Sequence, residues 1–192
     1  RVAIVGAGGI GFDTAEYLVH TPLLDPRAFE LPPLHSSLEQ GSPSLDTERW
    51  MAEWGVDPTF SGPGGLRKPS PEPPTREVWL LQRSPGKPGA KLGKTTGWIH
   101  RTALKAKHVK MLGGVEYLGF DDSGLRIRVD GREQLLPVDH VVVCAGQEPR
   151  RELADALQAT GVTAHLIGGA DLAAELDAKR AIAQGSQLAA GF

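Results

Sequence analysis

Short apolar runs alternate with helical patterns over the first part of the chain and predict an α/β fold. Residues 1–5 have the pattern of a buried strand, and residues 12–19 have that of the helix that follows it. Residues 77–82 and 109–112 are further apolar runs of strand length, separated by a helical pattern over 96–107. Strands that alternate with helices in this way are typical of a parallel sheet.

The pattern changes in the middle of the chain. Three short strands are predicted over 115–120, 125–129 and 134–138, with Asp130-Gly131 as a strong hairpin signal between the last two. A final apolar run over 141–145 predicts a return strand. The expected fold class is therefore α/β, a Rossmann-like parallel sheet in which a three-stranded antiparallel meander replaces one crossover. A C-terminal strand–helix segment follows it.

A Gly-x-Gly-x-x-Gly motif lies between the first strand and the first helix. It consists of Gly6, Ala7, Gly8, Gly9, Ile10 and Gly11. In this strand–loop–helix context the motif predicts dinucleotide binding. Gly6 is expected to allow the tight turn, Gly8 to let the backbone approach a pyrophosphate, and Gly11 to let helix and strand pack closely. The N–H groups at the helix start would face the phosphates. A glycine-rich turn without a ligand is the alternative.

Positive charge is concentrated in one segment, although the chain of 192 residues has a formal net charge of −2. Residues 83–110 contain eight Lys and Arg side chains and no Asp or Glu. Arg83 and Ser84 follow the second predicted strand, where a carboxylate would favour NAD and an arginine accommodates the 2′-phosphate of NADP. With Lys94 as a second positive charge, the segment predicts NADP(H) over NAD(H). The lysines from residue 105 onward are interpreted as a solvated face.

A long, mostly irregular insertion is predicted over residues 21–75, which hold eleven of the fifteen prolines. One short helix is expected from Asp46 to Trp54, with Asp46 as its N-cap. So long a connection within a compact domain is expected to be functional, interfacial or disordered. Trp50, Trp54 and Phe60 are its expected anchors, against a partner surface or against their own domain.

Composition excludes several classes of function. The net charge argues against general affinity for nucleic acids or membranes, and no apolar stretch reaches the length of a membrane span. The single cysteine, Cys144, cannot form an internal disulfide, fits a reducing, cytoplasmic compartment and is interpreted as a core residue. The histidines are too scattered to predict a metal site, and no residue is predicted to be catalytic. Because the chain has no initiator Met and begins inside a strand, we expect it to be part of a longer protein.

The C-terminal tail carries a second set of candidate residues. Gly146 ends the return strand in a Gly-x-x-Pro turn, and residues 163–168 have a strand pattern that leads into Gly169-Ala170-Asp171. This arrangement resembles the second flavin motif, whose aspartate hydrogen-bonds the ribityl or pyrophosphate region of FAD. The helix that begins near Ala178 would then direct its N-terminus toward the flavin. A plain helix N-cap is the alternative for Asp171.

Three longer segments give a more specific match. They are LGKTTGWIHR over 92–101, CAGQEP over 144–149 and ELDAKRAIAQG over 175–185. They resemble the bacterial NADPH-dependent 2,4-dienoyl-CoA reductases, old yellow enzyme-like flavoproteins with FMN, a 4Fe–4S cluster and FAD. The resemblance covers nearly the whole chain, although the insertion is matched mainly by position. It implies that NADPH reduces FAD and that electrons pass through the cluster to FMN, which reduces the dienoyl-CoA in unsaturated fatty acid β-oxidation.

The resemblance also implies domain limits and partners. Residues 1–146 correspond to an NADP(H)-binding domain, and residues 147–192 to the C-terminal part of an FAD-binding domain whose first half is missing. The FMN barrel, the cluster cysteines and the FAD half-domain would lie upstream in the same parent chain, because one cysteine cannot hold a four-thiolate cluster. The chain would be an electron-input module, inactive by itself. A non-catalytic nucleotide-sensing domain and an ADP-holding domain like that of trimethylamine dehydrogenase are the alternatives.

Overall fold

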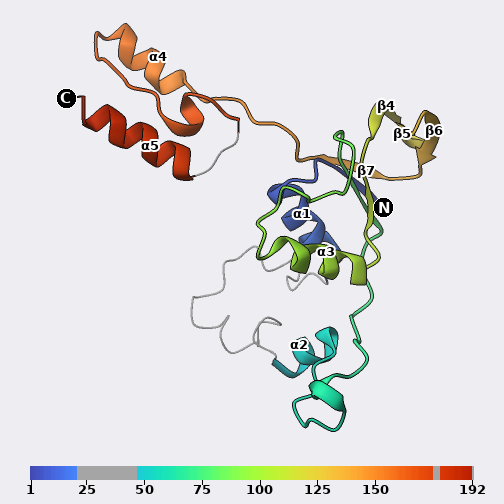
Figure 1. The fold of residues 1–192 in the computed structure, drawn as a ribbon. Coiled ribbons are helices and arrows are strands. Elements are labelled where there is room, and N and C mark those ends of the chain that lie inside the picture. The colour runs from blue at the N-terminus through green and yellow to red at the C-terminus, as the bar shows by residue number, and fades with distance from the viewer. Residues whose placement is uncertain (21–46, 175–177, 192) are drawn as a thin grey trace, which may run out of the picture. The chain divides into compact units, whose positions relative to one another are not determined.

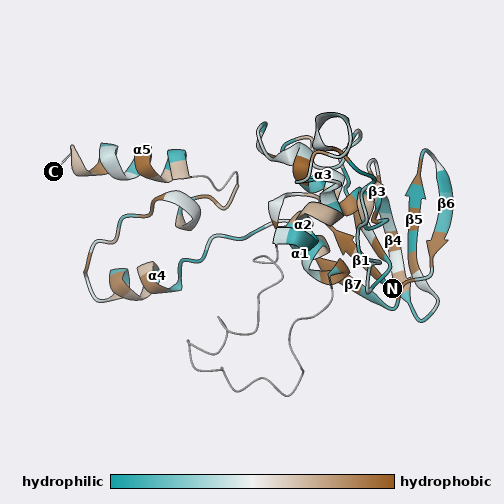
Figure 2. Ribbon diagram, turned by 90° about the horizontal axis from the view of Figure 1, so that it is seen from below, coloured by the Kyte–Doolittle hydropathy of each residue, from teal (hydrophilic) through white to brown (hydrophobic). Residues whose placement is uncertain are grey.

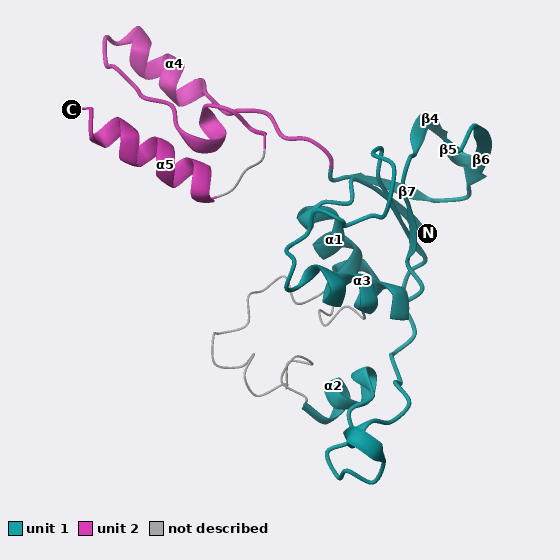
Figure 3. Ribbon diagram, viewed as in Figure 1, with its two compact units in different colours: residues 1–144 teal, residues 145–192 magenta. Residues whose placement is uncertain are grey.

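The structure is a computed structural model and describes residues 1–20, 47–174 and 178–191. It divides the chain into two compact units, Arg1–Cys144 and Ala145–Phe192 (Figure 3). The first unit contains two sheets and three helices among its described residues, and the second contains two helices and a single 3₁₀ turn. None of the helices in the described ranges is long and apolar enough to cross a membrane.

The first unit, which contains the N-terminus in Figure 1, is built on a four-stranded parallel sheet. The strand order is β3-β2-β1-β7. Its strands are β1 (Val2–Val5), β2 (Val78–Leu81), β3 (Lys110–Leu112) and β7 (His140–Val143). Val5 of the central strand β1 is level with Leu81 of β2 and with Val143 of β7. Because the strands are parallel, their carboxyl ends lie at one edge of the sheet. The predicted Rossmann-like parallel sheet is confirmed.

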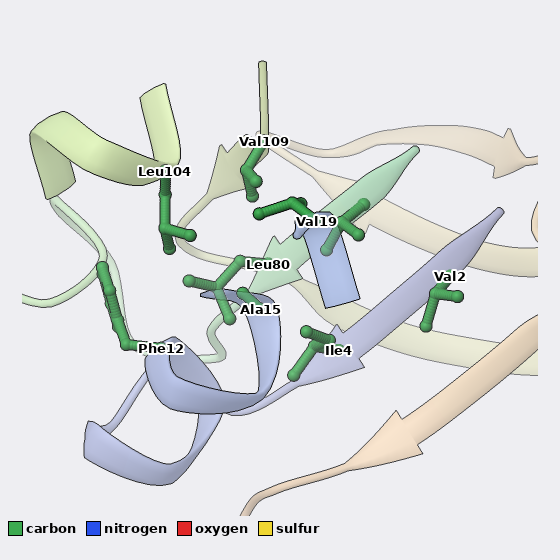
Figure 4. Close-up of a cluster of buried hydrophobic side chains, with 9 residues drawn as sticks. Val2, Ile4, Phe12, Ala15, Val19, Leu80, Leu104 and Val109 are labelled. Carbon is green, nitrogen blue, oxygen red and sulfur yellow. The ribbon is translucent and has the colours of Figure 1, made fainter. Parts of the chain in front are cut away.

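Two helices, α1 (Gly9–Val19) and α3 (Gly97–Ala106), pack on one face of this sheet. Alternate residues of β1 and β2 point to that face, because side chains alternate along a strand. Phe12 and Val19 of α1 meet Ile4, Leu80 and Leu104 in a cluster of buried side chains (Figure 4). Each of these five residues is at most 1% exposed. Burying one such side chain contributes about 1.5–3 kcal/mol, so this cluster holds α1 and its glycine loop on the sheet.

A three-stranded antiparallel meander packs against the other alternate residues of the sheet. Its strands are β4 (Glu116–Asp121), β5 (Gly124–Val129) and β6 (Arg132–Leu136). Ala3 and Trp79 of the parallel sheet share a second buried cluster with Ile127 of the meander. Asp130 and Gly131 both have positive φ, 50° and 74°, as the predicted tight hairpin turn requires. The meander therefore connects β3 to β7 where a simple Rossmann fold has a helix, as predicted.

The described part of the insertion contains α2 (Thr47–Trp54) and a short 3₁₀-helix (Pro63–Gly65). The helix was predicted, and its expected N-cap, Asp46, lies outside the described residues. Lys107 of α3 has a side chain that is only 4% exposed; its ammonium donates to the Glu53 carboxylate at 2.8 Å and to the Glu72 carbonyl oxygen at 3.1 Å. This contact ties the insertion to the core. The interpretation of Lys107 as part of a solvated face is therefore wrong.

Of the three expected aromatic anchors of the insertion, Trp54 is half-buried, whereas Trp50 and Phe60 are exposed. Trp50 is 51% exposed and Phe60 is 76% exposed. Asp57 organises the loop instead, because its carboxylate accepts hydrogen bonds from the backbone N–H and hydroxyl groups of Thr59 and Ser61, at 2.5–2.9 Å. The hydrogen bonds from Ser61 and Thr59 hold the pKa of Asp57 well below its ordinary value of 3.8.

The second unit contains α4 (Glu152–Ala159), a 3₁₀-helix (Gly168–Ala170) and α5 (Ala178–Ala189). The helix that begins at Ala178 was predicted. No residue of either helix is buried within the described part of the chain, and both carry apolar segments, brown in Figure 2. The strand predicted over 163–168 is wrong, because residues 163–167 form neither strand nor helix. A strand needs a neighbour for its backbone hydrogen bonds, and no described residue of this unit supplies one.

Candidate dinucleotide-binding site

The glycine loop leaves the carboxyl end of β1 and turns directly into α1. Gly6 has φ +115°, which favours glycine, and its N–H donates to the Leu81 carbonyl oxygen at 2.8 Å. A Cβ on Gly11 would lie 1.8 Å from the Gly6 carbonyl oxygen, so the helix can start this close to the strand only with glycine there. By contrast, Cβ atoms on Gly8 and Gly9 would meet nothing within 4 Å. The loop is therefore closely packed against the fold at Gly11 and open to solvent at Gly8 and Gly9.

The start of α1 lies on the open side of the loop. Gly8 is the N-cap residue and makes no side-chain cap, and the first turn contains no acidic residue. Gly9 is exposed, and the side chain of Ile10 is 56% exposed. The first N–H groups of a helix have no partner inside the helix and form the positive end of its dipole. This helix start can therefore bind an anion such as a pyrophosphate.

The loop after β2 places Arg83 at the same edge of the sheet. The loop is fixed by hydrogen bonds from Val115 N–H to the Gln82 carbonyl oxygen, at 3.0 Å, and from Gly114 N–H to the Ser84 carbonyl oxygen, at 2.9 Å. Arg83 and Ser84 are exposed. Arg83 makes no hydrogen bond or ion pair with any residue that the structure describes. An exposed, unpaired guanidinium on a fixed loop is suited to bind a phosphate.

The basic loop that follows packs against the start of α1. A Cβ on Gly89 would lie 2.5 Å from the Phe12 ring, and the Arg101 guanidinium donates to the Gly89 carbonyl oxygen at 2.8 Å. Lys94 is exposed in this loop, two residues before Thr96. Thr96 is the N-cap residue of α3, but its side chain makes no cap hydrogen bond. Thus Lys94 shares a loop with Arg83, and no direct contact joins the two.

Cys144 lies where β7 ends, next to the carboxyl end of β1. Its N–H donates to the Val5 carbonyl oxygen at 2.7 Å, and its sulfur lies 3.6 Å from the Thr14 hydroxyl of α1. The half-buried side chain packs on the buried cluster beneath α1. Its interpretation as a core residue is therefore confirmed. The chain crosses to the opposite side of β1 between β3 and β7, and dinucleotides bind outside such a switch point.

The remaining candidate residues belong to the second unit. Gly146 is exposed and has φ +80°. Gly169 lies inside the 3₁₀-helix, and the Asp171 carboxylate follows that helix and accepts a hydrogen bond from the Gln184 amide of α5 at 2.8 Å. Gln184 also accepts from the Gly168 N–H at 2.7 Å. Asp171 therefore does not cap α5, which begins at Ala178, but is held against the side of that helix.

Two cavities are formed by described residues of the first unit, and neither the glycine loop nor Arg83 lines them. One of them, about 590 Å³, lies between α1, α2 and α3, and Trp50, Trp54, Ile99 and Lys107 are among its lining residues. Within the described ranges, no group of three or more His, Cys, Asp or Glu residues could hold a metal ion. The candidate site is therefore an open edge of the sheet, and it lacks a metal centre formed by the described residues.

No protein-family model matches the chain. A metal reductase of Desulforamulus reducens is 24% identical to it over 170 residues, which are 88% of this chain and 22% of that protein. Solved structures similar to the chain include 2-naphthoyl-CoA reductase in complex with 2-naphthoyl-CoA, at 18% identity and a TM-score of 0.56, over 96% of this chain and 20% of that one. An engineered water-forming NADPH oxidase bound to NADPH aligns over 81% of this chain and 23% of its own, at 16% identity and a TM-score of 0.40.

The similarity to solved structures agrees with the observed fold. The likeness to 2-naphthoyl-CoA reductase covers nearly the whole chain and shows a shared Rossmann-like α/β fold. The likeness to the NADPH oxidase is too weak to carry an argument. The chain spans about a fifth of the length of the curated relative it matches. The metal reductase and 2-naphthoyl-CoA reductase are both named as reductases.

Two features of the site were missed in the sequence. A Cβ on Gly113 would lie 2.0 Å from the Gly86 carbonyl oxygen, so this glycine lets the segment after β3 reach the Arg83 loop. The Gly113-Gly114 pair after the third apolar run was a readable signal of such a close approach. The other feature is Tyr117 of β4, whose hydroxyl is buried and has no partner among the described residues. No local pattern signals it, because its burial arises from packing of the meander on the sheet.

Proposed function

We propose that the chain is the NADPH-binding electron-input module of a multi-cofactor flavoprotein oxidoreductase. One observation carries the proposal. The open glycine loop follows β1 and an unpaired Arg83 follows the adjacent strand β2, so both lie at the carboxyl edge of one parallel sheet. Dinucleotide-binding folds use these two positions for the pyrophosphate and for the 2′-phosphate.

The residues present fit the dinucleotide. The space above Gly8 and Gly9 admits a pyrophosphate, and the N–H groups from Gly9 to Gly11 are available as donors at the helix start. Arg83, with Ser84 and Lys94 on the same loop, supplies donors and positive charge for the 2′-phosphate of NADP. The bound nicotinamide supplies a hydride, and the part of these residues is to bind and orient the cofactor.

The second unit supports the flavin part of the proposal. Gly146, Gly169, Asp171 and Ala178 stand at the positions of the flavin motif that the sequence resembles, and Gln184 orients the Asp171 carboxylate. Neither helix of this unit buries a residue within the described part of the chain, as expected for a segment completed by another half-domain. We therefore assign to it part of an FAD site. The missing half-domain of the same parent chain is its partner.

The remaining cofactors do not fit this chain. A 4Fe–4S cluster needs four thiolates, and Cys144 is the single cysteine. In the proposal the cluster and FMN lie elsewhere in a longer, cytoplasmic protein. The final acceptor, 2,4-dienoyl-CoA, rests on the three sequence segments alone. The relatives are named for other acceptors, a metal and 2-naphthoyl-CoA, so these names favour reductive chemistry without favouring one acceptor.

Calorimetric titration with NADPH tests the proposal. Arg83→Ala removes the unpaired guanidinium, and Lys105→Ala removes a positive charge from the exposed surface of α3 as the matched control. A hydrogen bond to a charged group contributes about 1.5–3 kcal/mol, so Arg83→Ala should weaken NADPH binding roughly tenfold or more. Lys105→Ala should leave it unchanged. Equal losses in the two variants would mean that general charge attracts the nucleotide, and the assigned site would be wrong.

A further inference from the structure

Tyr117 carries an unsatisfied polar group next to the proposed phosphate site. It lies in β4, and its ring packs against the buried cluster that joins the meander to the parallel sheet. Its hydroxyl oxygen is buried and has no hydrogen-bond partner among the residues that the structure describes. A buried hydroxyl without a partner costs stability, so its presence calls for an explanation.

The segment that leads into β4 is fastened to the Arg83 loop on both sides of Arg83. Gly114 N–H donates to the Ser84 carbonyl oxygen at 2.9 Å, and Val115 N–H donates to that of Gln82 at 3.0 Å. Burial raises the pKa of the Tyr117 hydroxyl, and the positive charge of Arg83 acts in the opposite direction. Tyr117 follows Val115 by two residues, so the backbone hydrogen bonds on both sides of Arg83 also place Tyr117 close to the loop that carries Arg83. Since the net shift is upward, the phenol keeps its proton at neutral pH and is a donor.

The two groups lack complementary partners. Tyr117 is a donor without an acceptor, and Arg83 is a cation without an anion among the described residues. One anionic oxygen ligand would satisfy both groups at once. We propose that the Tyr117 hydroxyl donates a hydrogen bond to the 2′-phosphate that Arg83 binds, which makes Tyr117 a residue that determines selectivity for NADP(H). This inference rests on the proposed function.

The test compares Tyr117→Phe with Tyr17→Phe by calorimetry on the full chain. Tyr117→Phe keeps the ring and removes the hydroxyl, and Tyr17, 72% exposed on α1, is the only other tyrosine. Tyr117→Phe should weaken binding of NADPH and of adenosine 2′,5′-bisphosphate about tenfold, and leave NADH and 5′-AMP unchanged. Tyr17→Phe should change none of the four affinities. The two adenosine probes isolate the 2′-phosphate from the rest of the cofactor.

Thermal melting without ligand gives a second measurement, in which Tyr117→Phe should not weaken the protein although it weakens NADPH binding. If the hydroxyl has no partner in the free protein, Tyr117→Phe should melt at the wild-type temperature or above it. A lower melting temperature, or equal losses for NADPH and NADH, would overturn the inference in favour of a packing role. Unchanged NADPH binding in Tyr117→Phe alongside weakened binding in Arg83→Ala would overturn it and leave the proposed function standing. A wild type that binds NADH as tightly as NADPH would instead remove the proposed function and the inference together.

Discussion

Replacing Gly11 by alanine is expected to destabilise the first unit. The new Cβ would lie 1.8 Å from the carbonyl oxygen of Gly6 and 2.9 Å from its carbonyl carbon. Both atoms belong to the backbone, so no side-chain rotation can relieve the contact. Either the glycine loop or the start of α1 has to move, and both are held by the buried cluster around Phe12 and Leu80.

The size of the effect follows from two opposing contributions. Overpacking a well-packed contact costs about 1–3 kcal/mol, and a backbone clash places this substitution at the upper end. Alanine is preferred over glycine inside a helix by about 1 kcal/mol, which offsets part of that cost. The net loss is about 2 kcal/mol. For a unit of this size it corresponds to a fall in Tm of roughly 6 °C.

Circular dichroism at 222 nm during heating measures this fall. Gly9→Ala is the matched control, because it lies in the same helix and its Cβ would meet nothing within 4 Å. The control should melt at the wild-type temperature or slightly above it. A melting temperature of Gly11→Ala within about 1 °C of the control would refute the close approach of α1 to β1 at this glycine.

Three other perturbations have defined outcomes. Gly8 has φ −85°, and a Cβ there would meet nothing within 4 Å, so Gly8→Ala should leave the Tm nearly unchanged. The new methyl group would occupy the side of the loop that a pyrophosphate approaches, so the NADPH affinity measured by calorimetry should fall. Lys107→Ala should lower the Tm by a few degrees, because it leaves Glu53 without its partner, whereas Lys105→Ala should not. The pKa of Asp57 in the folded protein lies below its ordinary value of 3.8. Asp57 should therefore stabilise the insertion fully above about pH 4, and this stabilisation should be lost as the pH falls. Trp fluorescence during an acid titration measures the loss.

Each of these outcomes has a contrary result. Normal NADPH binding by Gly8→Ala would reduce the glycine loop to a turn. Equal melting of the two lysine variants would show that the ion pair with Glu53 does not fasten the insertion. A Trp fluorescence transition at acid pH that is unchanged in Asp57→Asn would assign the transition to other carboxylates.

The strands and turns whose formation depends on neighbouring residues in the sequence could be predicted. Residues 2–4 and 78–81 are buried on both faces of the sheet, so they form continuous apolar runs that are visible in the sequence. The turn at Asp130-Gly131 could be predicted because both residues take positive φ. The strand expected over 163–168 failed for a non-local reason. Its apolar residues fit a strand, but no described segment of its unit pairs with it.

In the candidate site, too, local features could be predicted and long-range contacts could not. Gly6 and Gly11 follow from the motif, since the turn and the close helix–strand contact are local consequences of glycine. The burial of Lys107 was not visible, because its partners lie far away in the sequence, in the insertion. The Tyr117 hydroxyl is buried without a partner among the described residues because of how the meander packs on the sheet. No residue near Tyr117 in the sequence indicates that packing.

Binding of NADPH at the Arg83 edge of the sheet is tested most directly by the ratio of two dissociation constants, Kd for NADH over Kd for NADPH, measured by calorimetry on the wild-type chain. An unpaired guanidinium that gains one charged hydrogen bond predicts a ratio of roughly ten or more. The ratio should approach one in Arg83→Ala. A wild-type ratio near one would contradict the assignment of Arg83 to the 2′-phosphate.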